Sequence, residues 1–229
     1  MRRWGRPERP DVEEIVMPDI TADMWPWIAL AGIGLFHGVN PAMGWLFAVA
    51  LGLHRNSQRV MLLSLVPIAI GHAVAVATVL IAVLALGLVV DRGLLARIAA
   101  ILLIGWALWH ALYGHRQRLR VGMQTGMAGL LLWSFLMASA HGAGLMLIPM
   151  LFPICAVGTS GTTDGGVTTA ALAALGLHTA VMLAAIAIIS ITVYNRIGVA
   201  FLRRGWINLD LVWIGALLTC GVALLINSP

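Results

Sequence analysis

Six long apolar segments, separated by short polar connectors, take up most of this 229-residue chain. The segments are Met24–Leu53, Val60–Val90, Leu94–Gly114, Gly126–Val157, Val167–Tyr194 and Trp206–Ile226. A helix needs about 20 apolar residues to cross the hydrocarbon of a bilayer. The composition agrees, because 61% of the residues are apolar and 10% are charged, against about 25% charged residues in soluble domains. The sequence therefore predicts an all-α polytopic membrane protein with about six transmembrane helices, and it excludes a soluble fold.

The charged residues lie in the N-terminal end, in the connectors and near the ends of the segments. Residues 1–23 carry four arginines and six acids, which predicts a polar tail. No connector is long enough for a soluble domain, so residues 24–226 are predicted to form a single membrane domain. The arginines are scattered singly and in pairs, which argues against nucleic acid as a partner. The expected partners are the lipid bilayer and a small ion or small-molecule substrate; a homo-oligomer or an accessory subunit of a complex also fits.

Arginine counts near the segment ends indicate the orientation. With six spans, one side holds the connectors 54–59, 115–120 and 195–205, with two, three and three arginines, while residues 91–97 on the other side hold two. Cytoplasmic connectors are enriched in arginine and lysine. We therefore expect a multi-pass protein of a bacterial-type inner membrane, with both termini on the non-cytoplasmic side.

The first segment contains a signal for a helix break, His37-Gly38-Val39-Asn40-Pro41. Asparagine is a favoured N-cap residue and proline is favoured at the first helical position after the cap. We expect this helix to stop near Gly38 and to restart at Pro41. The other overlong segments must tilt or break to fit the bilayer.

The two halves of the chain resemble each other in the placement of their histidines. His37 and His72 in the first half are 35 residues apart, and His141 and His178 in the second half are 37 residues apart. In each half a further apolar segment follows. This pattern predicts a 3+3 internal repeat, with repeat one at residues 24–114 and repeat two at residues 126–226. Because three spans is an odd number, the halves would be inverted relative to each other, as in many transporters.

The four histidines lie at similar depths in their segments, 11 to 15 residues after each segment begins. At about 1.5 Å per residue this depth is close to the middle of the bilayer. Ionisable groups at that depth are functional candidates by default, and neutral imidazole is a common ligand of transition metals. His37, His72, His141 and His178 are therefore the predicted metal ligands, with Cu, Zn, Ni and Co not distinguished.

Five further residues are predicted to line the same site: Asn40, Pro41, Met137, Ser139 and Met182. Met137 and Met182 lie four residues from His141 and His178, on the same helical faces. A helix that restarts at Pro41 carries partial positive charge at its N-terminus, which suits an anion or the carboxylate of a metal-bound ligand.

Two other functions are compatible with the histidines. Paired imidazoles from facing helices could hold haem in an electron-transfer protein. Enzymatic activity has less support, because Ser139 and His141 point to different helix faces and do not form a nucleophile–base pair. The carboxylates beyond the tail are Asp91, Asp164 and Asp210, all at segment ends or in connectors.

The histidine motifs resemble those of the lysine-exporter superfamily, and more closely its nickel/cobalt-efflux and related metal-handling branches. The resemblance depends on His37-Gly38-Val39-Asn40-Pro41 and on Gly71-His72-Ala73-Val74-Ala75-Val76, followed by a second three-helix half. It implies a six-helix inner-membrane exporter with inverted repeats. The metal-efflux branches carry acidic and additional histidine residues near the first motif, and this chain does not, so the cargo stays open.

Overall fold

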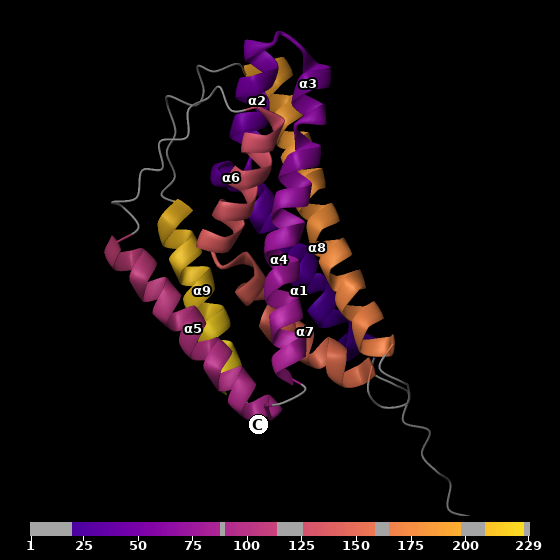
Figure 1. The fold of residues 1–229 in the computed structure, drawn as a ribbon, viewed down its shortest axis with the longest axis vertical. Helices are drawn as coiled ribbons and strands as arrows, with labels where there is room; N and C mark the ends of the chain where they lie inside the picture. Colours follow the sequence, from indigo (N-terminus) through magenta and orange to yellow (C-terminus); the bar gives the residue numbers. More distant parts are fainter. Residues whose placement is uncertain (1–19, 88–89, 114–125, 159–164, 198–208, 227–229) are drawn as a thin grey trace, which may run out of the picture.

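A computed structural model of the chain describes residues 20–87, 90–113, 126–158, 165–197 and 209–226, and these residues form helices without strands. The α-helices are α1 (Ile20–Val39), α2 (Trp45–His54), α3 (Gln58–Leu63), α4 (Leu65–Gly87), α5 (Arg92–Tyr113), α6 (Met127–Ala140), α7 (Ala143–Gly158), α8 (Gly165–Thr192) and α9 (Leu209–Ile226). A 3-10 turn, η1 (Pro41–Met43), separates α1 from α2, and a π turn, η3 (Val193–Ile197), follows α8. Each predicted apolar segment thus corresponds to one α-helix or to two consecutive ones (Figure 1). Of the tail predicted at residues 1–23, residues 1–19 lie outside the described part of the chain. The remaining four residues belong to α1, which begins at Ile20.

The predicted break in the first segment is present. Asn40 caps the 3-10 turn, with its side-chain oxygen accepting a hydrogen bond from the Ala42 amide at 3.0 Å, and Pro41 takes the first position of the turn. Regular α-helix resumes only at Trp45 rather than at Pro41. The reason is Gly44, whose φ of +128° interrupts the helix and is accessible to glycine alone at little cost.

A second break divides the fourth segment between α6 and α7. His141 is the C-cap residue of α6, and Gly142 follows with φ +67°. The two helices meet at an angle of 61°. The length of this segment predicts that it tilts or breaks, and the structure shows that it breaks.

Three helix pairs dominate the packing: α1 with α8, α4 with α6, and α5 with α9. Glycines allow the first two pairs to approach closely. A Cβ atom at Gly38 would lie 2.5 Å from the Met182 carbonyl oxygen of α8, and one at Gly71 would overlap the Leu131 carbonyl of α6. The α5–α9 pair lies beside the other helices, with α7 between (Figure 1).

The outer surface of the bundle is apolar and its interior holds polar side chains. Ile81, Ile101 and Ile188 are mostly exposed, whereas the four predicted metal ligands are buried. By length and composition, three helices of the described residues can cross a membrane: Gln58–Gly87, Gly93–Tyr113 and Val167–Arg196. The bent α6–α7 pair makes a fourth if it is one span. Three shorter apolar helices, Met24–Val39, Trp45–His54 and Leu211–Ile226, complete the set.

Candidate functional site

The structure brings three of the four predicted histidines together. His37 comes from the last turn of α1, His72 from α4 and His178 from α8, and each is at most 1% exposed. Their ring centroids are 5.0 Å (His37–His178), 5.5 Å (His72–His178) and 5.7 Å (His37–His72) apart. We refer to these residues as the three-histidine cluster. Its members come from three different helices, so it exists only when the tertiary fold is formed.

Backbone carbonyls fix the orientation of two of these imidazoles. Nδ1 of His37 lies 2.8 Å from the Ile33 carbonyl oxygen, and Nδ1 of His178 lies 3.4 Å from that of Leu30. A carbonyl oxygen only accepts hydrogen bonds, so each neutral ring carries its proton on Nδ1 and has a lone pair on Nε2. The Nε2 atom of His37 is buried and has no hydrogen-bond partner. This is the arrangement in which a second ring nitrogen is ready to accept a cation or a proton.

His72 and His178 contact each other directly through their ring nitrogens. The two Nε2 atoms are 3.3 Å apart. Since Nε2 of His178 has the lone pair, His72 donates its Nε2 proton to it. The cluster therefore contains one hydrogen-bonded pair of imidazoles and one adjacent imidazole with an unused lone pair.

The sequence predicts all four histidines at one point, and the ring contacts of His141 in the structure are with Trp213 and His110. The Trp213 indole of α9 contacts both rings, with centroid distances of 4.8 Å to His37 and 4.9 Å to His141, and it is nearly perpendicular to each of them. The ring of His110, from α5, lies 5.6 Å from the His141 ring by centroids. Among the described residues, no three His, Cys, Asp or Glu side chains are arranged to hold a metal ion as they stand.

Four tryptophans that the sequence analysis did not select satisfy the backbone at the two helix breaks. At the first break, the Nε1–H of Trp45 donates to the Val39 carbonyl at 3.0 Å, and that of Trp133 donates to the Ala42 carbonyl at 3.4 Å. At the second break, the Nε1–H groups of Trp106 and Trp213 donate to the carbonyls of Ala140 and His141, both at 2.8 Å. The sequence holds nine tryptophans, and nothing in their spacing marks these four.

The five residues predicted to line the site have different environments. The Asn40 side chain caps the 3-10 turn that Pro41 begins. Met182 is fully buried in an apolar cluster with Trp45, Met61 and Ile186. The Met137 carbonyl accepts a hydrogen bond from Nδ1 of His141 at 2.8 Å. Ser139 lines a cavity.

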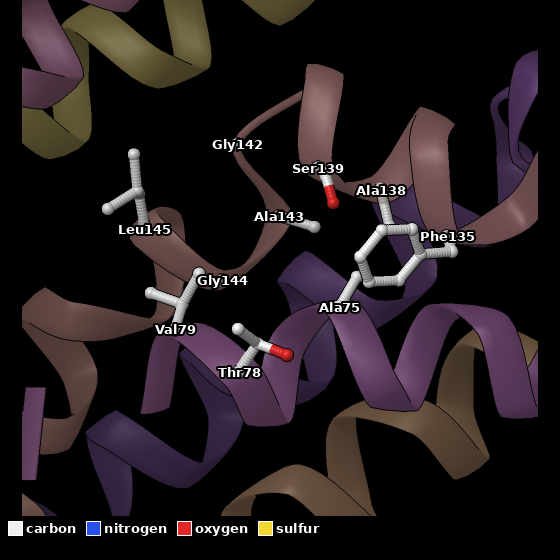
Figure 2. A pocket seen from close by; sticks show the side chains of 10 residues that line it. All are labelled: Ala75, Thr78, Val79, Phe135, Ala138, Ser139, Gly142, Ala143, Gly144 and Leu145. Atoms are coloured by element: carbon white, nitrogen blue, oxygen red, sulfur yellow. The ribbon is translucent and has the colours of Figure 1, made fainter. Parts of the chain in front are cut away.

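This cavity, of about 180 Å³, lies where α4 faces the α6–α7 break (Figure 2). The hydroxyl-bearing side chains of Thr78 and Ser139 lie on its opposite walls, and Phe135 and the backbone around Gly142 complete the lining. Ala75, which also lines it, is three residues after His72 and on the same face of α4. The cavity therefore lies one helical turn from the three-histidine cluster along α4.

The described residues thus define an all-helical protein in which several helices are apolar enough to cross a membrane and which encloses a buried group of histidines. No protein-family model, no curated protein and no solved structure matches the chain.

Proposed function

We propose that this protein is a small multi-pass transporter of a bacterial-type inner membrane, and that its cargo is a transition-metal ion or a metal-bound ligand. The observation that carries the proposal is the three-histidine cluster, buried between α1, α4 and α8. Buried ionisable side chains within a bilayer are costly and typically mark substrate or ion pathways. In this proposal His37, His72 and His178 bind the cargo.

One pair of nitrogens in the cluster has the spacing that a tetrahedral cation needs. Nitrogen ligands at about 2.0–2.1 Å from zinc are about 3.3 Å from one another, and the Nε2 atoms of His72 and His178 are 3.3 Å apart. Nε2 of His37 would supply the third lone pair. Binding requires His72 to present its own Nε2 lone pair, so its proton moves to Nδ1 or leaves. In this proposal the rings change orientation when the ion binds, because no three such side chains of the described residues are arranged to hold it as they stand.

The arrangement of the helices supports a transporter with inverted repeats. In a 3+3 repeat, α1 of the first half corresponds to α6 of the second, α4 to α8 and α5 to α9. A symmetric structure then contains the α1–α8 contact and its equivalent, the α6–α4 contact. The α5–α9 contact is its own equivalent. These are the three dominant pairs. The α1 and α6 helices each end at a break beside a histidine. Discontinuous helices at the repeat interface are typical of secondary transporters. We propose membership of the lysine-exporter superfamily on this basis and on the sequence motifs.

The haem alternative is less compatible with the cluster. Bis-histidine ligation places the two nitrogens on opposite faces of a porphyrin. His72 and His178 are within hydrogen-bond distance of each other, which leaves no room for a porphyrin plane between them. An absorption spectrum of the purified protein tests this directly, because a Soret band would favour haem over metal transport.

The proposal is tested by metal flux into proteoliposomes that contain a metal-sensitive dye, with Zn²⁺, Co²⁺, Ni²⁺ and Cu⁺ offered separately. We expect wild-type protein to pass at least one of these ions, and His72→Ala or His178→Ala to lower the flux by about 10–100-fold or more. His54→Ala, which removes an exposed imidazole at the end of α2, is the matched control and should leave the flux unchanged. Wild-type flux from the triple variant His37→Ala/His72→Ala/His178→Ala would refute the proposal.

A further inference from the structure

His72 differs from the other buried histidines in the way its ring is held. The Nδ1 atom of each of the other three rings lies beside a backbone carbonyl oxygen, at 2.8 Å for His37, 2.8 Å for His141 and 3.4 Å for His178. In His37 and His141 this oxygen belongs to the residue four positions earlier on the same helix. The hydrogen bond that the structure gives the His72 ring is instead at Nε2, with Nε2 of His178 at 3.3 Å.

The carbonyl that His72 would use in the same way already has another donor. The residue four positions before His72 is Ile68, and its carbonyl oxygen accepts a hydrogen bond from the Ser134 hydroxyl of α6 at 2.7 Å. In an α-helix the same oxygen also accepts the backbone N–H of the residue four positions later. A carbonyl oxygen has two lone pairs, so the Ser134 hydroxyl takes the one that an Nδ1–H of His72 would need. This favours the His72 tautomer with the proton on Nε2.

Close packing of α4 on α6 holds the Ser134 hydroxyl at this carbonyl. The Ser134 side chain is 3% exposed. A Cβ atom at Gly71, next to His72, would lie 3.0 Å from the Ser134 Cβ, well inside the optimal separation of about 3.5–4.0 Å for carbon atoms. Glycine at position 71 therefore lets a side chain of α6 reach the backbone of α4.

The corresponding position in the first half of the chain holds a leucine. Ser134 and Leu30 each lie seven residues before the buried histidine near the end of their helix, α6 and α1, so they are equivalent in the proposed repeat. The backbone carbonyl of Leu30 accepts from Nδ1 of His178, the counterpart of His72. Where this position holds leucine, the histidine of the facing helix carries its proton on Nδ1. Where it holds serine, the proton is on Nε2.

We propose that Ser134 is a positioning residue of the three-histidine cluster, and that its hydrogen bond to the Ile68 carbonyl holds the proton of His72 on Nε2. The consequence for binding rests on the proposed function, in which a cation needs the Nε2 lone pairs of all three rings. When the cation binds, the His72 proton moves to Nδ1, where the occupied carbonyl offers no acceptor. A buried donor without a partner is unfavourable, so Ser134 weakens cation binding. Weaker binding suits a transporter, because an ion that binds must also be released.

NMR of the metal-free protein labelled with ¹⁵N-histidine tests the first step independently of transport. In wild-type protein we expect His72 signals of the Nε2–H tautomer, assigned by their absence from His72→Ala. In Ser134→Ala the Ile68 carbonyl is free to accept, and the signals should change to those of the Nδ1–H tautomer. Ser64→Ala is the matched control, because the Ser64 hydroxyl is also buried and donates to a backbone carbonyl, that of Met61 at 2.6 Å. It should leave the His72 signals unchanged.

Titration of the same purified variants with Co²⁺, followed by visible absorption, tests the second step. We expect Ser134→Ala to bind Co²⁺ about tenfold more tightly than wild-type protein, because the displaced proton then has an acceptor. Ser64→Ala should bind it as wild-type protein does. The direction of the change is informative, since a variant that only loosens the packing of α4 on α6 would bind Co²⁺ more weakly.

The outcomes separate this inference from the transport proposal. A His72 proton on Nδ1 in wild-type protein, or a tautomer that is unchanged in Ser134→Ala, would overturn the positioning role of Ser134. A changed tautomer with unchanged or weaker Co²⁺ binding would overturn its effect on the cation. If wild-type protein binds no Co²⁺ and passes none of the ions, the transport proposal fails, and the tautomer measurement still decides the role of Ser134.

Discussion

At the scale of single residues, indole N–H groups donate hydrogen bonds to backbone carbonyls that the helix breaks leave without a partner in the helix. A break frees backbone carbonyls, and each unsatisfied one costs several kcal/mol in a bilayer because no water can replace the lost hydrogen bond. Trp45 and Trp133 satisfy the first break, and Trp106 and Trp213 the second. The large apolar ring fits between helices while its single donor reaches the backbone. Each break thus has two donors from side chains.

The first prediction concerns one of these donors. Trp45→Phe removes the hydrogen bond to the Val39 carbonyl and leaves that buried acceptor unsatisfied, so we expect the free energy of unfolding to fall by about 1–3 kcal/mol. Unfolding of the detergent-purified protein measures it. Trp109→Phe is the matched control, since Trp109 is 51% exposed and its replacement should change stability little. An equal loss in both variants would contradict a capping role for Trp45.

A second prediction distinguishes two roles of Asn40. Its side chain caps the Ala42 amide, so Asn40→Ala should lower the free energy of unfolding by about 1 kcal/mol, whereas Asn40→Ser, which keeps an acceptor oxygen, should lose less. Metal flux measured on both variants tests the sequence-based expectation that Asn40 binds substrate. Flux lost in both variants, with stability retained in Asn40→Ser, would favour substrate binding over capping.

The sequence predicts that the four histidines are buried, but not which rings contact one another. Counting residues along a helix gives height along its axis, and the four predicted ligands are buried inside the protein; their depth in a bilayer stays a prediction. Which direction a ring faces around the axis depends on the partner helices, and no residue count gives that. His141 thus makes a close contact with Trp213, a residue 72 positions further along the chain, which no residue count predicts. The sequence analysis does not select His110, because this residue lies near the end of its apolar segment, where histidine is common.

At the scale of elements, close approach between α1 and α8 places His37 beside His178. Gly34 and Gly38 lie one turn apart on α1, and Cβ atoms there would meet the carbonyls of His178 and Met182 at 2.6 and 2.5 Å. Small residues at i and i+4 allow two helix backbones to approach in this way. The glycines therefore set the width of the space in which the cluster forms.

The third prediction follows from this contact. Gly38→Ala forces α1 and α8 apart, so we expect a loss of about 1–3 kcal/mol in unfolding free energy together with weaker Co²⁺ binding by the cluster. Gly32→Ala is the control, because its new Cβ would have no atom within 4 Å. The free energy of unfolding of this variant should rise by up to about 1 kcal/mol, since alanine favours the helix more than glycine does. Unfolding and Co²⁺ titration of both variants provide the measurements, and unchanged Co²⁺ binding in Gly38→Ala would show that helix spacing does not control the cluster.

The two helix breaks were unequally predictable. Asn40-Pro41 is a strong signal for a helix start, because the asparagine side chain can cap a backbone N–H group and the proline ring fixes its own φ at a helical value. The first break lies at these two residues. The second break has only Gly142, and glycine is common inside membrane helices, so its positive φ leaves no distinctive sequence pattern. The sequence does show that this segment is longer than one upright membrane span needs, which predicts that it tilts or breaks.

At the scale of the whole molecule, the helices alternate in direction between two ends of the bundle. The α2–α3 connector and the end of α8 share one end, where Met61 and Tyr194 pack in the same apolar cluster, and the end of α4 lies at the other (Figure 1). Connector 54–59 and the described start of connector 195–205, residues 195–197, therefore lie at one end of the bundle; that both connectors face the cytoplasm stays a prediction. Residues 114–125 of the third arginine-rich connector lie outside the described part of the chain.

The last prediction tests this arrangement in a membrane. Arg55, Asp91 and Arg196 are exposed, and the apolar stretch Gln58–Gly87, long enough to cross, lies between the first two. In a background with Cys155 and Cys220 replaced by alanine, Arg55→Cys and Arg196→Cys should react with an impermeant thiol reagent only when the cytoplasmic face is open, in inside-out vesicles. Asp91→Cys should react in right-side-out vesicles, because the arginine-rich connectors face the cytoplasm. Labelling of Arg55→Cys and Asp91→Cys from one side would mean that α3 and α4 do not cross together, and the inverted repeat would then lose its basis, since it requires an odd number of crossings in each half.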